Sequence, residues 1–552
     1  MQAYGERRVP VETEKLYRLR GYWDDRLVDD VVLAPARTAP DRLALVDGER
    51  RLTHGELATR VERAARAFLG AGLSPGDRVV VRLPNSAELA VTLLALLRAA
   101  VAPVLMVPTL GRRELDHITA TTGARGLILA RKPDGSAERA YRELCDRVDL
   151  AFAAFLSGRT SGDLPDGVGD LPDGAADLGR LLASNPPPAV SPPVRSAADV
   201  AFHLLSGGTT GLPKAIARTH RDYVHNIEIS ARLTGLDAGT RYLAALPVTH
   251  NFALGCPGAL GTLAVGGTVV MGSPAPGALA AAIERERITV TALVPGPARA
   301  LADAEADLTS LRVLQVGGAR LYEPDARRLR ARLGPGRLQQ VFGMAEGMLS
   351  FTRLDDPDDI VATTQGRPAS PGDEWRIVGP DGTPVPDGLP GELHVRGPYT
   401  VRGYTGAPEA DTEAFTPDGY YRTGDVVRLH PSGNFVVEGR RRDFINRGGE
   451  KVAASEIETL LADHPDLRDV AAVPAPHDYY GEVVCLFAVP EGAHLPPLTQ
   501  IRRYLRDRGL APHGLPDLLR PLDRMPVTAV GKPDRAALAA AAARDARTDR
   551  GS

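Results

Sequence analysis

A chain of 552 residues is too long for a single hydrophobic core, so we expect at least two domains. Its 66 basic and 69 acidic side chains nearly cancel, which argues against a nucleic-acid-binding protein or a polybasic membrane anchor. The three cysteines, Cys145, Cys256 and Cys485, are far apart and predict neither a disulfide framework nor a zinc site, as in a reducing cytoplasm.

Neither a signal peptide nor a membrane span is expected. The first fifteen residues lack the apolar core that a secretory signal needs. The most apolar stretch, residues 255–272, is interrupted by glycines and by Pro257, and it predicts a buried helix and strand instead of a membrane span. We therefore predict a cytoplasmic protein.

Helical and strand-like patterns alternate through the first 320 residues. Helices are predicted at 56–69 and 86–99, and strands at 78–83 and 103–107. A second series of strands follows at 200–205, 242–246, 268–271, 289–294 and 311–316. This alternation is typical of βαβ units, so we predict an α/β protein with two doubly wound, mostly parallel layers.

The remaining segments differ in composition. Residues 157–196 are rich in Gly, Asp and Pro, which predicts a surface insertion or flexible loop. After residue 371, short strands with Gly/Pro turns predict a small β-rich subdomain that ends near residue 442. The last hundred residues predict a compact α+β module, with helices at 454–464 and 498–509, strands at 470–473 and 483–489, and a frayed tail at 540–552.

A glycine-rich loop follows the predicted strand 200–205. It reads Ser206-Gly207-Gly208-Thr209-Thr210-Gly211-Leu212-Pro213-Lys214, so three glycines free the backbone while hydroxyls and a lysine supply donors for a triphosphate. A plain surface turn is the alternative. The lysine follows a proline and no G-K-[ST] is present, which disfavours a P-loop kinase or NTPase.

Further motifs follow in order: Gln340-Val341-Phe342-Gly343-Met344-Ala345-Glu346, Tyr421-Arg422-Thr423-Gly424-Asp425, residues 439–451, and Gly531-Lys532. Together with the loop, they resemble the adenylate-forming superfamily of acyl-CoA synthetases, firefly luciferase and peptide-synthetase adenylation domains. The resemblance implies that ATP and Mg²⁺ activate a carboxylic acid as its acyl-AMP, after which a thiol takes the acyl group. It also implies a small β-barrel-like subdomain and a small mobile α+β C-terminal domain.

The resemblance implies a role for each motif. Glu346 would bind Mg²⁺, Asp425 would accept the ribose hydroxyls, and Lys532 would stabilise the reacting α-phosphate. Without the resemblance, these residues would be read as a solvated glutamate, a turn aspartate and a solvated lysine. The implied ATP-binding set is Ser206, Gly207, Thr209, Thr210, Lys214, Gly317, Ala319, Gln340, Val341, Phe342, Gly343, Asp425 and Arg440.

The domain division follows from the same resemblance. Residues 1–442 would form the adenylation core, and residues 443–552 would form a lid that swings about a hinge at Asp443. After the first half-reaction the lid would withdraw Lys532 and present Gly448, Gly449 and Lys451 for thioester formation. Solvated arginines are the alternative for part of the run 440–442.

The segment after His250 closely resembles the stand-alone salicylate–AMP and 2,3-dihydroxybenzoate–AMP ligases of siderophore assembly. In that group the asparagine, here Asn251, hydrogen-bonds the ortho-hydroxyl side of the acid, which would reject an acid that lacks the hydroxyl. Cys256 and Leu349 resemble the salicylate enzymes, and a thiol would leave the ring 3-position facing an apolar wall. The implied pocket consists of Asn251, Phe252, Cys256, Gly318 and Leu349, with His250 among the catalytic residues.

Three alternatives stay open at this point. Ala253 replaces a proline common in the siderophore enzymes, so 2,3-dihydroxybenzoate or a substituted salicylate is a possible acid, and Cys256 could be a core residue only. The acceptor thiol would be the phosphopantetheine of a separate aryl carrier protein, with coenzyme A as the alternative. A catalytically silent AMP-binding protein is disfavoured because Glu346, Asp425 and Lys532 are all present.

Overall fold

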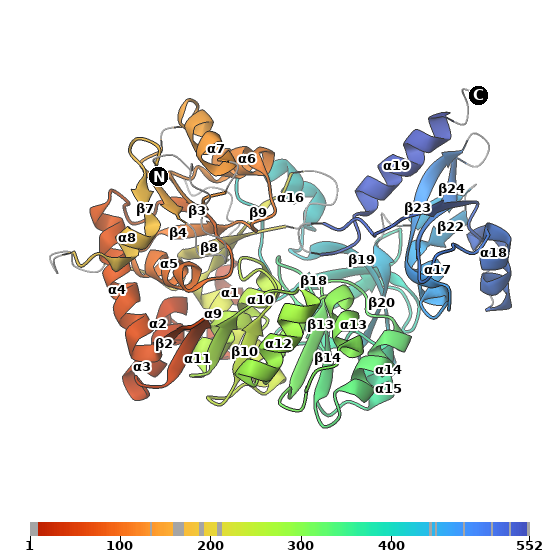
Figure 1. Ribbon diagram of the computed structural model, residues 1–552, viewed down its shortest axis with the longest axis horizontal. Helices are drawn as coiled ribbons and strands as arrows, with labels where there is room; N and C mark the ends of the chain where they lie inside the picture. Colours follow the sequence, from red (N-terminus) through yellow and green to blue (C-terminus); the bar gives the residue numbers. More distant parts are fainter. Residues whose placement is uncertain are drawn as a thin grey trace.

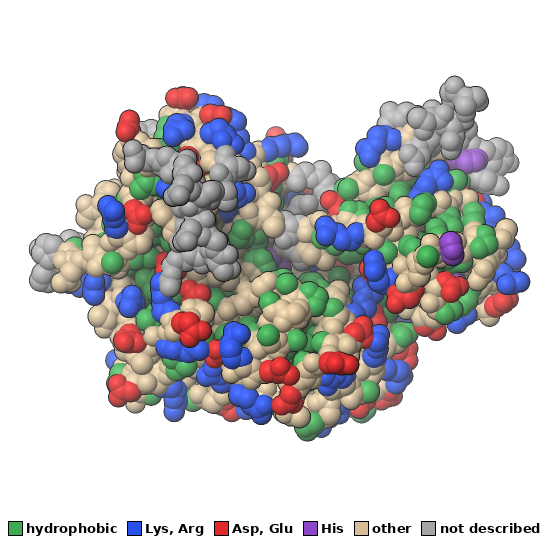
Figure 2. All heavy atoms as spheres, in the orientation of Figure 1, with side chains coloured by type: hydrophobic (Ala, Val, Ile, Leu, Met, Phe, Trp, Pro, Cys, Tyr) green, Lys and Arg blue, Asp and Glu red, His purple; other side chains and the backbone are tan. Residues whose placement is uncertain are grey.

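The computed structural model describes residues 9–132, 135–148, 150–157, 171–186, 193–206, 212–440, 444–447, 450–477, 481–508, 510, 512–528 and 531–548. Two large sheets and a smaller one form the body of the protein, and a fourth sheet with its helices forms a separate group at the C-terminal end (Figure 1). Within these residues, no helix combines the length and the apolar character needed to cross a membrane. On the face in Figure 2, basic and acidic side chains are interspersed.

The first sheet has seven strands in the order β7-β6-β5-β3-β4-β8-β9, of which only β9 runs antiparallel to its neighbour. Its strands are β3 (Arg78–Arg82), β4 (Ala102–Leu105), β5 (Gly126–Ala130), β6 (Phe152–Leu156), β7 (Ala176–Asp177), β8 (Val200–Leu205) and β9 (Ala215–Thr219). Runs such as Val79–Val80–Val81 are buried on both faces, as is usual for parallel strands covered by helices.

The second sheet has nine strands in the order β16-β15-β14-β13-β12-β10-β11-β1-β2. Its strands are β1 (Leu43–Asp47), β2 (Arg50–Thr53), β10 (Arg241–Ala244), β11 (Thr268–Met271), β12 (Val290–Leu293), β13 (Val313–Gly317), β14 (Arg337–Gly343), β15 (Leu349–Phe351) and β16 (Arg367–Pro368). The six strands from β14 to β1 are parallel, and the antiparallel strands lie at the edges. The prediction of two mostly parallel layers is confirmed.

Helix α5 (Ala87–Arg98) explains how the two sheets are joined. It is mostly apolar, and all its residues from Ala87 to Leu97 are buried, including Glu88, which pairs with Arg50 at 2.6 Å. A helix of that kind has no face for water and must lie inside the protein. It contacts β1 of one sheet and β4 of the other, so one hydrophobic core spans both sheets.

The helices of the body lie either between the two sheets, where α2, α9 and α11 pack with α5 in the shared core, or around the sheets (Figure 1). They are α1 (Val11–Leu19), α2 (Val28–Leu33), α3 (Pro35–Thr38), α4 (His54–Gly70), α6 (Arg112–Thr122), α7 (Ser136–Cys145), α8 (Leu178–Ala183), α9 (His220–Thr234), α10 (Asn251–Gly255), α11 (Gly258–Ala264), α12 (Pro276–Glu286), α13 (Pro295–Asp303), α14 (Glu323–Arg332), α15 (Asp358–Thr363) and α16 (Pro408–Ala414), with α5 at Ala87–Arg98.

The third sheet is the β-rich subdomain, with four antiparallel strands in the order β17-β18-β19-β20. The third sheet comprises β17 (Glu374–Val378), β18 (Gly391–Arg396), β19 (Tyr421–Leu429) and β20 (Phe435–Arg440).

The C-terminal group contains the five-stranded fourth sheet. The C-terminal group comprises β21 (Phe444–Arg447), β22 (Glu450–Ala453), α17 (Ala454–Leu461), β23 (Leu467–His477), β24 (Gly481–Pro490), α18 (Leu498–Asp507), the 3-10 helix η2 (Pro512–Gly514), β25 (Leu518–Pro521) and α19 (Arg535–Thr548).

Two predictions about polar or small-residue segments are wrong in the parts that the structure describes; residues 158–170, 187–192 and 549–552 lie outside those parts. Within 157–196, β7 pairs with β6, and Leu178 of α8 is fully buried, so this part of the segment belongs to the first sheet. The tail is helical to Thr548 instead of frayed, because Leu538 and Ala542 pack against β23 and β24. In both places a few apolar side chains find a partner that the local composition does not reveal.

The C-terminal group contacts the body through polar side chains. Tyr322 donates to a Glu458 carboxylate oxygen at 2.9 Å, and Arg299 pairs with Asp469 at 2.7 Å. The position predicted for the domain boundary, at Asp443, lies outside the described residues.

Candidate active site

The glycine-rich loop begins where β8 ends, and its two ends are bonded together. The Ser206 N–H donates to the Lys214 carbonyl at 3.0 Å, and the Lys214 N–H donates to Ser206 Oγ at 2.9 Å. The predicted ligands Gly207, Thr209 and Thr210 lie outside the described residues. The loop therefore leaves and rejoins the first sheet at one point, and Lys214 stands at that point.

Lys214 and Glu346 converge on one tyrosine. Tyr404 donates to Glu346 Oε1 at 2.9 Å, and Lys214 Nζ lies 4.7 Å from the centre of the Tyr404 ring. The Glu346 residue is only 7% exposed, and burial together with the Glu346 carboxylate raises the pKa of Tyr404, which keeps its hydroxyl a donor. A cation and a carboxylate thus meet beside the phosphate loop. Tyr404 was not predicted, since a tyrosine between Gly403 and Thr405 has no local signature.

Arg218 fixes the backbone that leads to Glu346. Its side chain is fully buried and pairs with Asp222 at 2.8 Å. The same guanidinium donates to the carbonyls of Ala345, at 2.9 Å, and Tyr399, at 3.0 Å. A buried arginine that is paired and hydrogen-bonded in this way holds its partners in one geometry. Arg218 has no local signature in the sequence either.

The carboxyl ends of β13 and β14 form the floor of the site, as is typical of ligand sites in open α/β sheets. Gly317 pairs with Val341, and a Cβ added at Gly317 would lie 2.5 Å from the Val341 carbonyl oxygen and 3.1 Å from the Phe252 ring. Only glycine fits there. Ala319 follows the strand, and Val341, Phe342 and Gly343 pair with β15.

Gln340 points away from this floor. Its side-chain amide donates to the Val361 carbonyl at 2.6 Å and accepts from Gln365 at 3.3 Å. Its backbone N–H donates to Thr352 Oγ1 at 2.9 Å, and its carbonyl accepts from the Thr352 N–H at 3.0 Å. The ATP contact of Gln340 stays a prediction.

The C-terminal group brings Lys532 to the same strand ends. Gly318 has a positive φ of 80°, and a Cβ added there would lie 3.6 Å from Lys532 Cε. A tight turn holds the lysine, with the Thr528 N–H donating to the Lys532 carbonyl at 2.7 Å. Burial and, second, the Lys532 cation lower the pKa of His250 to about 4, so this imidazole is neutral at physiological pH. Lys532 therefore lies beside Gly318, and His250 is within electrostatic reach of its charge.

Asp425 and Arg440 are opposite each other on β19 and β20. Asp425 Oδ1 accepts from Arg440 Nε at 2.9 Å, and Asp425 is only 6% exposed. The pair lies at the end of β20 that leads to the C-terminal group. Of the predicted thiolation residues, Gly448 and Gly449 are outside the described residues, and for Lys451 only the backbone, paired with Asn446, is described.

The predicted acid pocket is built on α10. His250 caps this helix through a bond from the Phe252 N–H to its Nδ1 at 3.3 Å. Asn251, Phe252 and Cys256 are all buried, and so is Leu349 on β15, whose N–H donates to the Tyr399 hydroxyl at 3.1 Å. Asn251 contacts both Cys256 and Tyr223 of α9, and Tyr223 lies in no motif of the sequence.

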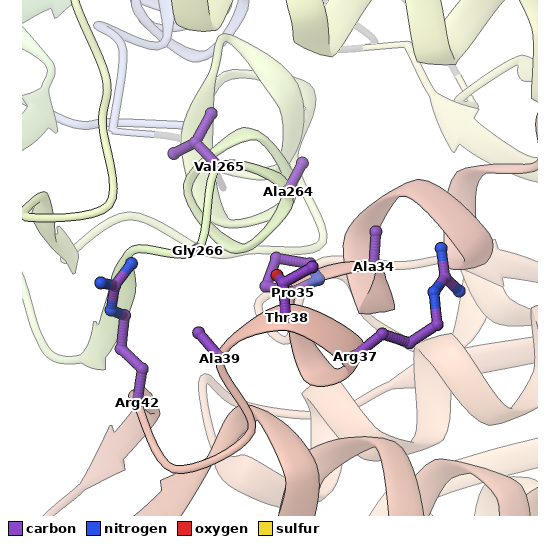
Figure 3. A pocket seen from close by; sticks show the side chains of 9 residues that line it. All are labelled: Ala34, Pro35, Arg37, Thr38, Ala39, Arg42, Ala264, Val265 and Gly266. Carbon is purple, nitrogen blue, oxygen red and sulfur yellow. The ribbon is translucent and has the colours of Figure 1, made fainter.

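A separate cavity of about 290 Å³ lies between α3 and α11 (Figure 3). Its lining is mostly small apolar residues, with Arg37 and Arg42 at opposite sides in this view. None of the predicted site residues line it. A pocket with few convergent polar groups does not fit the chemistry of an acid and a triphosphate.

Comparisons with known proteins agree with this arrangement. Residues 33–405 match the family of AMP-binding enzymes, and residues 456–532 match the C-terminal domain of AMP-binding enzymes. The salicyl-AMP ligase / salicyl-S-ArCP synthetase of Mycobacterium tuberculosis is 44% identical over 96% of this chain and 93% of its own length. The salicylyl-CoA synthase / salicylate adenylyltransferase of a Streptomyces species is also 44% identical, over 95% of each chain.

The apo structure of MbtA from Mycobacterium smegmatis has 43% sequence identity and a TM-score of 0.72. The similarity covers 96% of this chain and 98% of that one. These matches extend over both the large body and the C-terminal group.

Proposed function

Because the chain belongs to the AMP-binding enzyme family, we propose that it is a ligase that uses ATP to activate a 2-hydroxyaryl acid, with salicylate favoured, and transfers the acyl group to a thiol. The observation that carries this proposal is the grouping of charged side chains just beyond β13 and β14. Lys214 and Glu346 meet at Tyr404, and Lys532 lies beside Gly318. Cations, a carboxylate and an acid pocket in one place are what the reaction requires.

In the first half-reaction, a carboxylate oxygen of the acid attacks the α-phosphorus of ATP, and the bond from that phosphorus to the bridging oxygen breaks. Pyrophosphate leaves and the acyl-AMP stays. Two anions must approach each other, so fixed positive charge lowers the barrier. We assign this role to Lys532, next to Gly318 and His250, and assign Lys214 to the phosphates.

Glu346 is the residue that would hold Mg²⁺. Among the described residues, no group of three or more His, Cys, Asp or Glu side chains could hold a metal ion by themselves. A single buried carboxylate fits Mg²⁺, which usually binds one or two carboxylates together with substrate phosphates. When bound, the metal neutralises phosphate charge.

In the second half-reaction, a thiol attacks the acyl carbonyl, a thioester forms and AMP leaves. We propose that residues 443–552 move as a unit at this stage and that Gly448, Gly449 and Lys451 then approach the site. The relative named salicyl-S-ArCP synthetase supports an aryl carrier protein as the acceptor, and the salicylyl-CoA synthase supports coenzyme A as the alternative. Single-turnover transfer to each thiol distinguishes the two.

The test of the proposal is pyrophosphate exchange into ATP across a panel of aryl acids. Salicylate is expected to exceed 2,3-dihydroxybenzoate in kcat/KM by about tenfold, because the second hydroxyl would be buried against the Cys256 thiol and the Leu349 side chain without a strong partner. A reverse preference would refute the assignment of the acid, and exchange with none of the aryl acids would refute the proposed function.

Cys256→Ser is expected to reduce the preference for salicylate over 2,3-dihydroxybenzoate. A serine hydroxyl can hydrogen-bond the ring 3-hydroxyl, whereas a thiol bonds it only weakly. Burial raises the pKa of Cys256 to about 12, so the group present at neutral pH is the thiol. Cys485→Ser is the matched control, because Cys485 is equally buried but lies on β24 in the C-terminal group. A reduced preference for salicylate in both variants would contradict the assignment of Cys256 to the acid pocket.

A further inference from the structure

Three buried side chains, Tyr223 on α9, Asn251 on α10 and Cys256 at the end of α10, are joined by hydrogen bonds. The Tyr223 hydroxyl donates to Asn251 Oδ1 at 2.8 Å, and Asn251 Nδ2 donates to Cys256 Sγ at 3.5 Å. Tyr223 is completely buried, and Asn251 is 6% exposed. Asn251 directly follows His250, whose pKa is lowered by burial and, second, by the Lys532 cation. These hydrogen bonds therefore connect α9 with the position proposed for the acid.

The Tyr223 hydroxyl fixes the orientation of the Asn251 side-chain amide. Among the described residues, Asn251 Oδ1 is the single hydrogen-bond partner of the Tyr223 hydroxyl. If the amide were flipped, the hydroxyl would accept from the NH₂ group and its own hydrogen would be buried without an acceptor, which is costly. The carbonyl oxygen therefore faces Tyr223, and the NH₂ group faces Cys256.

The position of the tyrosine is itself strongly fixed. Its ring packs edge-on against Phe202 with the centroids 4.6 Å apart, and the Arg218 guanidinium lies 4.9 Å from the ring centre. Gly255 leaves room for the hydroxyl, since a Cβ there would lie 2.3 Å from Tyr223 Oη. Burial raises the pKa of Tyr223, which keeps the hydroxyl protonated as the donor.

We propose that Tyr223 is a positioning residue that holds Asn251 as a hydrogen-bond donor toward the acid, so that the site selects acids whose ortho group presents an acceptor. Salicylate is then preferred over 2-aminobenzoate. This inference rests on the proposed function and adds a residue and a basis of selection to it.

The two acids differ in what they present to Asn251. The ortho-hydroxyl of salicylate has one hydrogen, which it donates to its own carboxylate, and its oxygen lone pair then faces outward. The ortho-amino group of 2-aminobenzoate has two hydrogens. One bonds the carboxylate and the other points outward, where it meets the NH₂ group of Asn251. Two donors that face each other in a buried site are both left unpaired.

The experiment measures kcat/KM for salicylate and for 2-aminobenzoate in pyrophosphate exchange, with the full-length wild type and Tyr223→Phe. Without the hydroxyl, the Asn251 amide can turn its oxygen toward an amino group. The preference for salicylate is expected to fall by about tenfold, the effect of one unpaired buried polar group. A purely structural defect would lower both values and leave their ratio unchanged, and that result would overturn the inference.

Tyr242→Phe is the matched control. Tyr242 is also completely buried, and burial and, second, Cys256 raise the pKa of its hydroxyl. Among the described residues, that hydroxyl has no hydrogen-bond partner. In Tyr242→Phe, the ratio of kcat/KM for salicylate to that for 2-aminobenzoate is expected to match the wild-type ratio. An equal fall in both variants would overturn the inference.

Asn251→Asp covers the case in which Tyr223→Phe does not fold. Aspartate keeps an oxygen for Tyr223 and places a second acceptor, in place of the NH₂ donor, toward the pocket. Both activities are expected to fall, and the ratio should move toward 2-aminobenzoate. An unchanged or higher preference for salicylate would overturn the inference. If the wild-type protein activated none of the aryl acids, the proposed function itself would be refuted, which is a different outcome from an unchanged ratio in Tyr223→Phe.

Discussion

Lys532→Ala is expected to lower acyl-AMP formation by about 10²–10³-fold, the usual effect of removing one donor that stabilises charge in a transition state. Lys532 is the cation that the C-terminal group places beside Gly318 and His250, where the acid carboxylate and the α-phosphate must meet. The measurement is the pre-steady-state rate of salicylyl-AMP formation with saturating ATP and salicylate.

The same variant provides its own control in the second half-reaction. Transfer of the acyl group from supplied salicylyl-AMP to the thiol acceptor should be nearly unchanged, because we propose that Lys532 has left the site by then. Arg524→Ala, which removes an exposed cation from the same C-terminal group, should leave both steps unaffected. Equal losses in both half-reactions of Lys532→Ala would contradict the assignment and would indicate a general defect in the C-terminal group.

The parts of this fold that could be predicted from the sequence are those that depend on local pattern. Buried parallel strands are short apolar runs, so β8 and β11 occur at the predicted residues, and the apolar character of α5 alone requires an interior position. The segment around α8 and the tail could not be predicted in this way, since their burial depends on strands and helices far away in the sequence.

The same distinction applies to the candidate site. Glu346 and Lys532 stand in motifs, so resemblance singles them out, and the structure places them near the strand ends. Arg218, Tyr223 and Tyr404 carry no motif. Each acts through a partner between 28 and 127 residues away, for example Tyr223 with Asn251 and Arg218 with Ala345. A hydrogen bond of that kind arises only when the chain is folded, so periodicity and composition give no signal for it.

Glu346→Gln is the second substitution for which we expect a large effect. Glutamine keeps the size of the side chain and an oxygen that can accept from Tyr404, but it removes the negative charge. If the carboxylate holds Mg²⁺, acyl-AMP formation should fall by about a hundredfold, and the Mg²⁺ concentration for half-maximal exchange should rise. The measurement is pyrophosphate exchange over a series of MgCl₂ concentrations at fixed ATP.

Tyr404→Phe separates the charge of Glu346 from its hydrogen bond. This variant keeps the carboxylate, the aromatic ring and the ring's contact with Lys214, and it removes only the hydroxyl that donates to Glu346. A metal-binding role predicts a small loss and an almost unchanged Mg²⁺ requirement. If instead both variants lost the same activity with no change in Mg²⁺ dependence, Glu346 would act through Tyr404 on the structure of the site. The buried carboxylate would then serve to orient the tyrosine and the Lys214 side chain beside the phosphates, and the metal would need another ligand.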